Sequence, residues 1–377
     1  MKIAIEALDL LFFRNAKPFD AVDSPFGETL EMPYTSTVYG ALRSKILSEN
    51  SHLYQDFKLG EAGELTEVIG SPARKGSLEI NFFSILNEDD EIFLAIAKDL
   101  VVDKDNPNDI FSLDLNKKPD WLSCDSNFKF DYILSTSKDV KVEKPERKYI
   151  SLKNLEKYLN NNPNLDIEEQ NLEFFAKEYR TGIKINKDIN KVEEGMIYRK
   201  ELLSLKDGYK FYLELSNDKG LLPKEGLLKL GGESKGANYY PKDIDSSIKL
   251  TAETKARIKE SKKFKIYLAT PAIFNQGWLP DLIDKDSLIA RLDNGIEFKV
   301  IASAIEKYKM VSGWDIAKGG PKDAYRVLPA GSVYYCEVLN DDFNVDDLLD
   351  KLHGQIISDK RQKDGFGITY LGGVKNV

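Results

Sequence analysis

Residue types that perform acid–base or nucleophilic chemistry are scarce in this chain. Its 377 residues include only two histidines, His52 and His353, and two cysteines, Cys124 and Cys336. Their spacing matches no zinc site, and two cysteines make no disulfide framework, which is typical of a reducing cytoplasm. We expect His353, just after an amphipathic segment, to satisfy a helix end, and His52 to lie on the surface. These patterns favour a protein that is not an enzyme and has no metal or cofactor.

Glycine-rich turns do not change this expectation. The pairs Gly231-Gly232 and Gly319-Gly320 are not followed by Gly-Lys-Ser/Thr at the spacing of a nucleotide-binding P-loop. The sequence therefore predicts binding rather than catalysis.

The first candidate binding residues lie near the N-terminus. Arg14 and Lys17 place two cations in a loop after the first predicted strand. In the helix predicted to follow, three small residues share one face with Arg43 beside them: Ser36, Gly40 and Ser44. Glycine inside a helix costs about 1 kcal/mol, so we expect something to approach that face closely. It is either a ligand or another protein segment.

Two later segments add candidates. One turn combines small residues, a hydroxyl and a cation, which suits a backbone-binding loop as well as an ordinary turn; it holds Gly231, Gly232, Ser234 and Lys235. A second loop places Trp314 near Lys318, so the tryptophan either stacks on a base or packs in the core.

Charge is distributed unevenly along the chain. The net charge is −8, but residues 49–109 carry −9 and residues 337–351 carry −5, so the remainder carries +6. The overall acidity argues against indiscriminate coating of nucleic acid, which depends on phosphate neutralisation. All the candidate residues lie in the basic remainder, and we expect both acidic segments to face away from any bound RNA.

The elements expected around these residues repeat in kind. We predict helices over 35–48, 151–159, 166–179, 223–229, 284–291 and 344–357. We predict strands over 2–13, 80–86, 91–102, 196–204, 209–215, 264–269, 296–303, 332–339 and 366–371. The order βαββαβ occurs twice, so the fold class is α+β, with two ferredoxin-like (βαββαβ) domains in tandem, the first with a large insertion.

The domain boundaries follow from this order. The N-terminal domain spans residues 1–245 with its insertion at about 103–195, a linker spans 246–262, and the C-terminal domain spans 263–377. No apolar stretch approaches 18 residues, so we expect no membrane contact and a cytoplasmic location.

Eight segments, taken in order, resemble one known family. The chain resembles subunit three of the Cmr complex, the type III-B CRISPR effector, within the RAMP superfamily. The segments are LDLLFFRNAKPFD (8–20), PYTSTVYGALRSKI (33–46), TGIKINKDINKVEEGMIYRKELL (181–203), LGGESK (230–235), LATPAIFNQGWLPD (268–281), MVSGWDIAKGGPK (310–322), LPAGSVYYCEV (328–338) and GFGITYLGG (365–373).

The resemblance implies a non-catalytic subunit in antiviral defence. It implies binding of the 5′ tag of the CRISPR RNA (crRNA), and contact with the large polymerase-like signalling subunit and with backbone subunits. The basic candidates would contact phosphates, the glycines would admit the RNA backbone, and Trp314 would stack. The RNA-facing residues so implied are Arg14, Lys17, Ser36, Gly40, Arg43, Ser44, Gly231, Gly232, Ser234, Lys235, Trp314 and Lys318.

Two other functions stay open at this point. One is a metal-independent crRNA-processing endoribonuclease of the same superfamily, with His52 as general base beside Tyr34 or Tyr39. The other is a protein scaffold without RNA contact.

Overall fold

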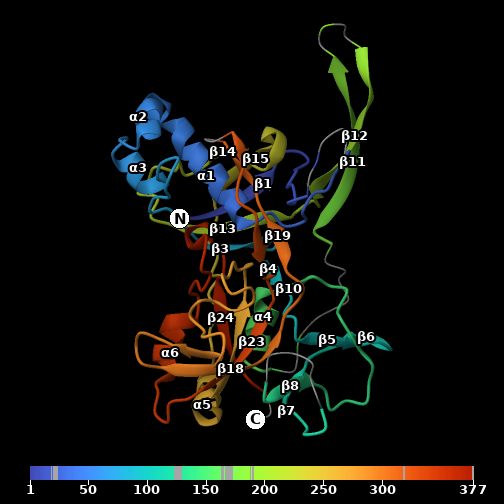
Figure 1. The fold of residues 1–377 in the computed structure, drawn as a ribbon, viewed down its shortest axis with the longest axis vertical. Helices are drawn as coiled ribbons and strands as arrows, with labels where there is room; N and C mark the ends of the chain where they lie inside the picture. Colours follow the sequence, from blue (N-terminus) through green and yellow to red (C-terminus); the bar gives the residue numbers. More distant parts are fainter. Residues whose placement is uncertain are drawn as a thin grey trace.

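The computed structural model describes residues 1–17, 19, 24–122, 130–162, 165, 173–186, 188, 191–316 and 319–375. The fold is mixed α/β, rich in strands and with few helices. Two antiparallel sheets form the body, one in the upper and one in the lower half of Figure 1, and a long two-stranded ribbon projects from the upper half.

The first sheet has seven strands in the order β10-β4-β3-β13-β1-β15-β14. Their bounds are β1 Lys2–Ala7, β3 Glu79–Leu86, β4 Ile92–Ala95, β10 Tyr149–Ser151, β13 Lys210–Ser216, β14 Gly226–Lys229 and β15 Gly236–Pro241. Helix α1 (Thr35–Glu49) lies over one face of this sheet because Val38, Leu42 and Ile46, spaced by four residues, are fully buried against it. The short elements η1 (Ser51–Leu53), α2 (Tyr54–Leu59) and α3 (Glu64–Ile69) follow α1.

The second sheet has five strands in the order β17-β18-β23-β16-β24. Their bounds are β16 Lys263–Leu268, β17 Ile289–Arg291, β18 Glu297–Ala304, β23 Val333–Val338 and β24 Thr369–Gly373. Helix α6 (Val345–Leu352) buries Val345, Leu348 and Leu352 in the core of this sheet, and α5 (Ala252–Ser261) buries Ile258 there.

A shared core joins the two sheets. Helix α4 (Leu152–Leu159) packs between them, with apolar residues of both sheets in one cluster. Within it the buried carboxylate of Asp99 accepts hydrogen bonds from Tyr158 and Tyr335, each at 2.6 Å. Because this network ties α4 to the second sheet, segments from both halves can form one site.

The remaining strands form small sheets at the periphery. The ribbon consists of β11 (Phe175–Asn186) and β12 (Lys191–Leu205), and β2 (Phe26–Gly27) pairs in parallel with the base of β12. The others are β5 Leu100–Asp103, β6 Asn106–Ser112, β7 Asp114–Lys117, β8 Tyr132–Ser135, β9 Val142–Glu143, β19 Lys309–Val311, β20 Trp314–Asp315, β21 Gly320–Pro321 and β22 Tyr325–Val327, with η2 at Gly232–Ser234 and η3 at Gln362–Asp364.

The two main sheets order their four central strands alike. In chain order, β1, β3, β13 and β15 are arranged 2-3-1-4, and so are β16, β18, β23 and β24. Helix α1 connects the first pair of strands in the first sheet, whereas α6 connects the last pair in the second.

Three helix predictions were wrong. Residues 284–291 form a turn and β17, because Leu288 has φ +61°, which ends the helical turn that Asp284 begins, and Ile289–Arg291 pairs with β18. Residues 226–229 pair with β15 as β14. Residues 175–179 of the helix predicted over 166–179 belong to β11, and most of its other residues lie outside the described chain.

The predicted domain boundaries stay predictions. The segment 103–195 contributes β10 to the edge of the first sheet and α4 to the shared core, and the segment 246–262 contains α5. Among the described residues, no helix is long and apolar enough to cross a membrane.

Candidate nucleic-acid interface

The loops at 8–17 and 231–235, here called the strand-end loops, lie against each other beside the base of the ribbon. The Gly232 N–H donates to the Phe12 carbonyl at 2.7 Å, and the Leu8 N–H donates to the Gly236 carbonyl at 3.1 Å. The fold therefore brings Arg14 and Lys17 into the same region as the Gly231–Lys235 turn.

The lysines of the strand-end loops are paired with carboxylates. Lys17 lies 2.7 Å from Glu28, and Lys235 lies 3.4 Å from Asp9. The hydrogen bond from Lys17 lowers the pKa of Glu28. Much of the positive charge in these loops is therefore neutralised within the protein.

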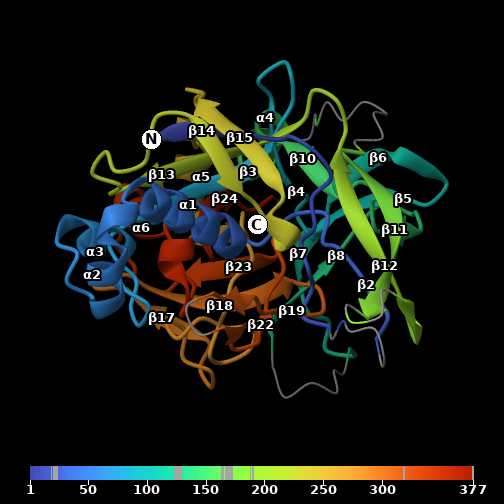
Figure 2. The ribbon, with the colours of Figure 1, turned by 90° about the horizontal axis from the view of Figure 1, so that it is seen from above.

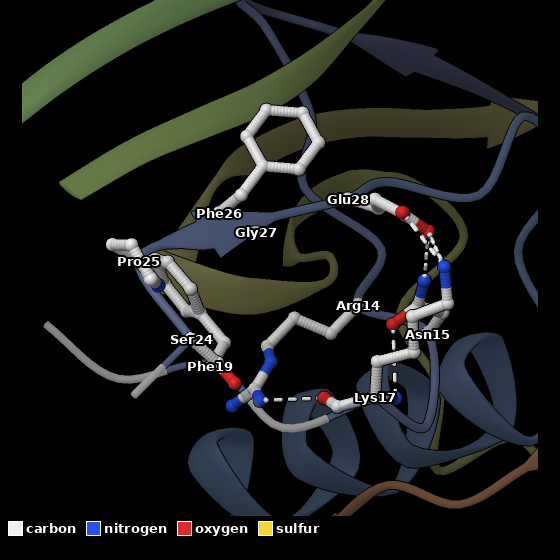
Figure 3. Close-up of a pocket in the computed structure, with 9 residues that line it drawn as sticks. All are labelled: Arg14, Asn15, Lys17, Phe19, Ser24, Pro25, Phe26, Gly27 and Glu28. Atoms are coloured by element: carbon white, nitrogen blue, oxygen red, sulfur yellow. Dashed lines mark hydrogen bonds and ion pairs between the residues drawn. The ribbon is translucent and has the colours of Figure 1, made fainter. Parts of the chain in front are cut away.

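Arg14 lines a small hollow beside β2 (Figure 3). Its guanidinium donates to the Lys17 carbonyl at 3.3 Å and lies 5.5 Å from the centre of the Phe19 ring. The hollow has a volume of about 330 Å³, and Phe26, 42% exposed, also lines it. A cation beside aromatic rings suits a nucleotide.

The glycines of the 231–235 turn serve the protein's own packing. Gly231 has φ +80°, and a Cβ there would lie 2.6 Å from the Phe12 carbonyl oxygen; at Gly232 it would lie 3.0 Å from the Phe12 ring. Ser234 is exposed beside them. The close approach at these glycines is thus made by residues of this chain.

The face of α1 that holds Ser36, Gly40 and Ser44 has a different character. A Cβ on Gly40 would meet nothing within 4 Å, and Ser44 is exposed. The Ser36 hydroxyl accepts a hydrogen bond from Arg361 at 3.4 Å. No described segment packs on Gly40, so close packing within the chain does not explain this glycine.

Helix α1 begins at Thr35, and Tyr34 occupies its N-cap position with no side-chain cap hydrogen bond. The Tyr34 hydroxyl instead bonds to the Met310 carbonyl at 3.3 Å, and its ring stacks on Phe366. Contacts with the second half thus replace the local cap.

Three cations that the sequence did not single out lie with Arg43 at the junction between the halves. They are Lys75 in the loop after α3, Lys322 after β21, and Arg361 before η3; with Arg43 we call these four residues the basic cluster. Lys75 pairs with Asp364 at 2.5 Å, and Arg43 donates to the Ser71 carbonyl at 3.2 Å. Lys322 and Arg361 form no ion pair with any described residue. Only the folded arrangement brings these distant positions together.

Trp314 lies on the strand pair that leads to Lys322. It is 59% exposed in β20, and the Lys322 N–H bonds to the Gly313 carbonyl at 2.8 Å. Trp314 is therefore not a core residue and is free to stack. Lys318 lies outside the described residues.

The residues proposed for endoribonuclease chemistry are separated. His52 is exposed beyond the C-terminal end of α1. Tyr39 lies near the start of that helix, and the ten residues from Tyr39 to Glu49 span about 15 Å. Burial raises the pKa of Tyr34 and of Tyr39 to about 12.

The other histidine has a structural role, as predicted. His353 ends α6, where its Nε2 bonds to the Ile248 carbonyl at 2.7 Å and its Nδ1 accepts from the Leu371 N–H at 3.1 Å. Within the part of the chain that the structure describes, no three His, Cys, Asp or Glu side chains gather as a metal site would require.

Comparisons with known proteins give one family. The model of the family described as CRISPR-associated protein (Cas_Cmr3) matches residues 3–374. No curated protein sequence matches the chain.

One solved structure shares the fold, and a second is reported with it. One is described as the cryo-EM structure of the Type III-B Cmr-beta bound to cognate target RNA and AMPPnP, state 1; its chain is 16% identical, with a TM-score of 0.51, and the match covers 89% of this chain and 86% of that one. A second structure, of the Type III-B Cmr-beta bound to cognate target RNA, has 15% identity, the same coverage and a TM-score of 0.49.

Proposed function

Because the chain belongs to the CRISPR-associated Cas_Cmr3 family, we propose that it is a non-catalytic subunit of a type III-B CRISPR effector complex. In that complex it binds the 5′ tag of the crRNA and docks on the large polymerase-like subunit and on backbone subunits. The family resemblance found in the sequence is confirmed, and it supports a subunit of a type III effector. The tag and the docking partners are the part that we propose.

The open face of α1 is the observation that carries the RNA-binding proposal. A Cβ on Gly40 would meet nothing within 4 Å, Ser36 accepts a hydrogen bond from Arg361 of the second half, and Trp314 is exposed in β20. These features can bind the end of an RNA strand. The open helix face leaves room for the RNA backbone, the cations contact its phosphates, and the aromatic ring stacks on a base.

The strand order supports a tandem ferredoxin-like architecture. Each sheet arranges its four central strands 2-3-1-4 and keeps one crossover helix, α1 in the first sheet and α6 in the second. We infer two ferredoxin-like units, each with one helix replaced by other structure. The basic cluster lies where these two units meet.

The ribbon supports assembly with other subunits. One side of it exposes apolar residues that a lone monomer rarely presents together: Tyr179, Ile183, Ile185, Val192 and Ile197, each 45–58% exposed. A two-stranded ribbon is marginal by itself, so contact with another molecule would stabilise it.

Photocrosslinking tests the proposed function directly. A guide RNA with a photoreactive group at its 5′ end is assembled with all subunits, and the crosslinked chain is identified. We expect the crosslink on this chain; a crosslink found only on other subunits would contradict the proposal. Incubating the purified chain with precursor RNA in EDTA tests the alternative, and we expect no cleavage.

A further inference from the structure

Three buried polar atoms on α1 lack partners among the described residues. They are the Thr35 hydroxyl, the Tyr39 hydroxyl and the Arg43 Nε. Thr35 and Tyr39 are each 2% exposed. The three residues follow one another at intervals of four and therefore share one side of the helix. A buried polar group without a partner is costly, so this side of α1 carries an unfavourable contribution to stability beside the cations described next.

This row of atoms runs beside the basic cluster. The Lys75 amine lies 5.3 Å from the centre of the Tyr39 ring, and the Arg43 guanidinium lies 6.0 Å from it. The Tyr39 ring therefore lies next to two of the four cations. The unpartnered hydroxyl and the cations belong to one location.

Burial and mutual repulsion make the charged forms of the clustered cations less favourable. Burial lowers the pKa of Lys322, and repulsion from Arg361 adds to this effect; Asp364 and Asp315 act in the opposite direction. Burial likewise lowers the pKa of Lys75, against the attraction of Asp364, while Arg361 and Lys322 repel it. An anion bound beside these crowded cations would stabilise their charged forms.

Arg361 and Lys363, which belong to the second half, make hydrogen bonds to the first half. Arg361 donates to Ser36 on α1, and Lys363 donates to the Gly76 carbonyl at 2.6 Å, next to Lys75. Together with the Lys75–Asp364 ion pair, these contacts hold the 361–364 segment against the first half. The site is complete only because both halves contribute to it.

We propose that Arg43, Lys75, Lys322 and Arg361 bind adjacent phosphates of an RNA backbone. This assignment rests on the proposed function and goes beyond it by naming the residues that hold the backbone. The ligand is a run of phosphodiesters, so binding at this site does not depend on base sequence.

Salt dependence of RNA binding by the full-length chain tests the assignment. The probe is a 3′-labelled, mixed-sequence single-stranded RNA of about eight nucleotides, measured by fluorescence anisotropy between about 50 and 200 mM salt. The double variant Lys322→Gln, Arg361→Gln removes two cations that form no ion pair. The matched control, Lys255→Gln with Lys259→Gln, removes two lysines of α5 that pair with Asp346 and Asp342 at the other end of the molecule.

Each lost phosphate contact reduces the slope of log affinity against log salt by about 0.7 for a single strand. We therefore expect the slope of the Lys322, Arg361 double variant to fall by about 1.4, with at least roughly tenfold weaker binding at the lower salt concentration. We expect the control to match wild type. An unchanged slope, or no binding by wild type, would overturn the assignment. Equal thermal unfolding temperatures for the variants and wild type confirm that the fold is intact.

The two proposals fail separately. If the guide 5′ end still crosslinks to this chain in the complex while the slope is unchanged, the function stands and the cluster does not hold the backbone. If the slope falls as expected but the crosslink is absent, the cluster binds RNA that is not the tag.

Discussion

Two basic regions of this protein, each built from segments far apart in the sequence, differ in how much charge they leave available. In the strand-end loops, Lys17 and Lys235 each face a carboxylate, and the glycines pack on the chain's own Phe12. In the basic cluster, Lys322 and Arg361 have no carboxylate partner among the described residues, and Gly40 nearby is open. The strand-end loops hold three lysines and arginines, two of them paired with carboxylates, whereas the basic cluster holds four, of which only Lys75 is paired with a carboxylate of a described residue.

The difference shows what positive charge requires in order to bind a ligand. A lysine in an exposed ion pair must exchange one partner for another and gains little. A cation crowded with others gains both attraction to the ligand and relief from repulsion. We therefore expect RNA binding to depend on the basic cluster more than on the strand-end loops.

Removing charge from each region in turn gives the largest expected contrast. Arg43→Ala with Arg361→Ala removes two charge-assisted contacts and should weaken retention of the guide RNA about a hundredfold. Lys17→Ala with Lys235→Ala should weaken it less than about threefold, because each removed cation was already paired. Filter binding of labelled guide by assembled complexes measures both. Equal losses would show that paired and unpaired cations contribute alike.

The tryptophans provide the next contrast. Trp314→Ala should weaken binding about tenfold, because stacking of one base on an aromatic ring is worth about 1–3 kcal/mol. Trp121, which is 81% exposed but lies in the segment 103–195, is the matched control. Trp121→Ala should leave affinity unchanged in the same assay. An equal or larger loss from Trp121→Ala would move the stacking site out of the β20 loop.

Substituting Gly231 and Gly40 should change the free energy of unfolding in opposite directions. Gly231→Ala should lower the free energy of unfolding by about 1–3 kcal/mol, because its φ is +80° and the new Cβ would meet the Phe12 carbonyl. Gly40→Ala should instead raise it by up to about 1 kcal/mol through helix propensity, since the Cβ meets open space. Urea unfolding of the two variants gives both values. Destabilisation by Gly40→Ala would mean that the α1 face is packed in solution.

The pH dependence should be the smallest effect. The pKa values of Lys75 and Lys322 are lowered in the free protein, with burial the largest cause, and a bound phosphate would raise them. Affinity should therefore be full at neutral pH and fall as pH rises through these lowered pKa values. Titrations of wild type and of Lys322→Gln in alkaline buffers test this, and the variant should show the shallower fall. Parallel curves would exclude Lys322 as the titrating group.

The sequence was most informative where a single segment carries the feature. It predicted helix α1, and it singled out Ser36, Gly40, Arg43 and Trp314 as candidate residues, because helical spacing and residue type are local properties. It missed Lys75 and Arg361, which are nearly 300 residues apart and meet only through the packing of the two halves. The acidic segment 49–109 was expected to face away from RNA, yet its loop supplies Lys75 to the basic cluster.

The errors in the predicted elements have the same origin. The segment 226–229 forms a strand because β15 is available to pair with it, and residues 289–291 form a strand because β18 pairs with them. The ribbon of β11 and β12 was recognised only in its second strand, since its first strand follows a segment that reads as helical. Tertiary partners decided each of these cases.

Lysine footprinting tests the central claim most directly. The assembled complex is acetylated with and without guide RNA, and modification at each lysine of this chain is measured by mass spectrometry. We predict that the guide RNA protects Lys322, which forms no ion pair with a described residue, while Lys17, which keeps its pair with Glu28, reacts equally in both samples. Protection of Lys17 with no change at Lys322 would contradict the account.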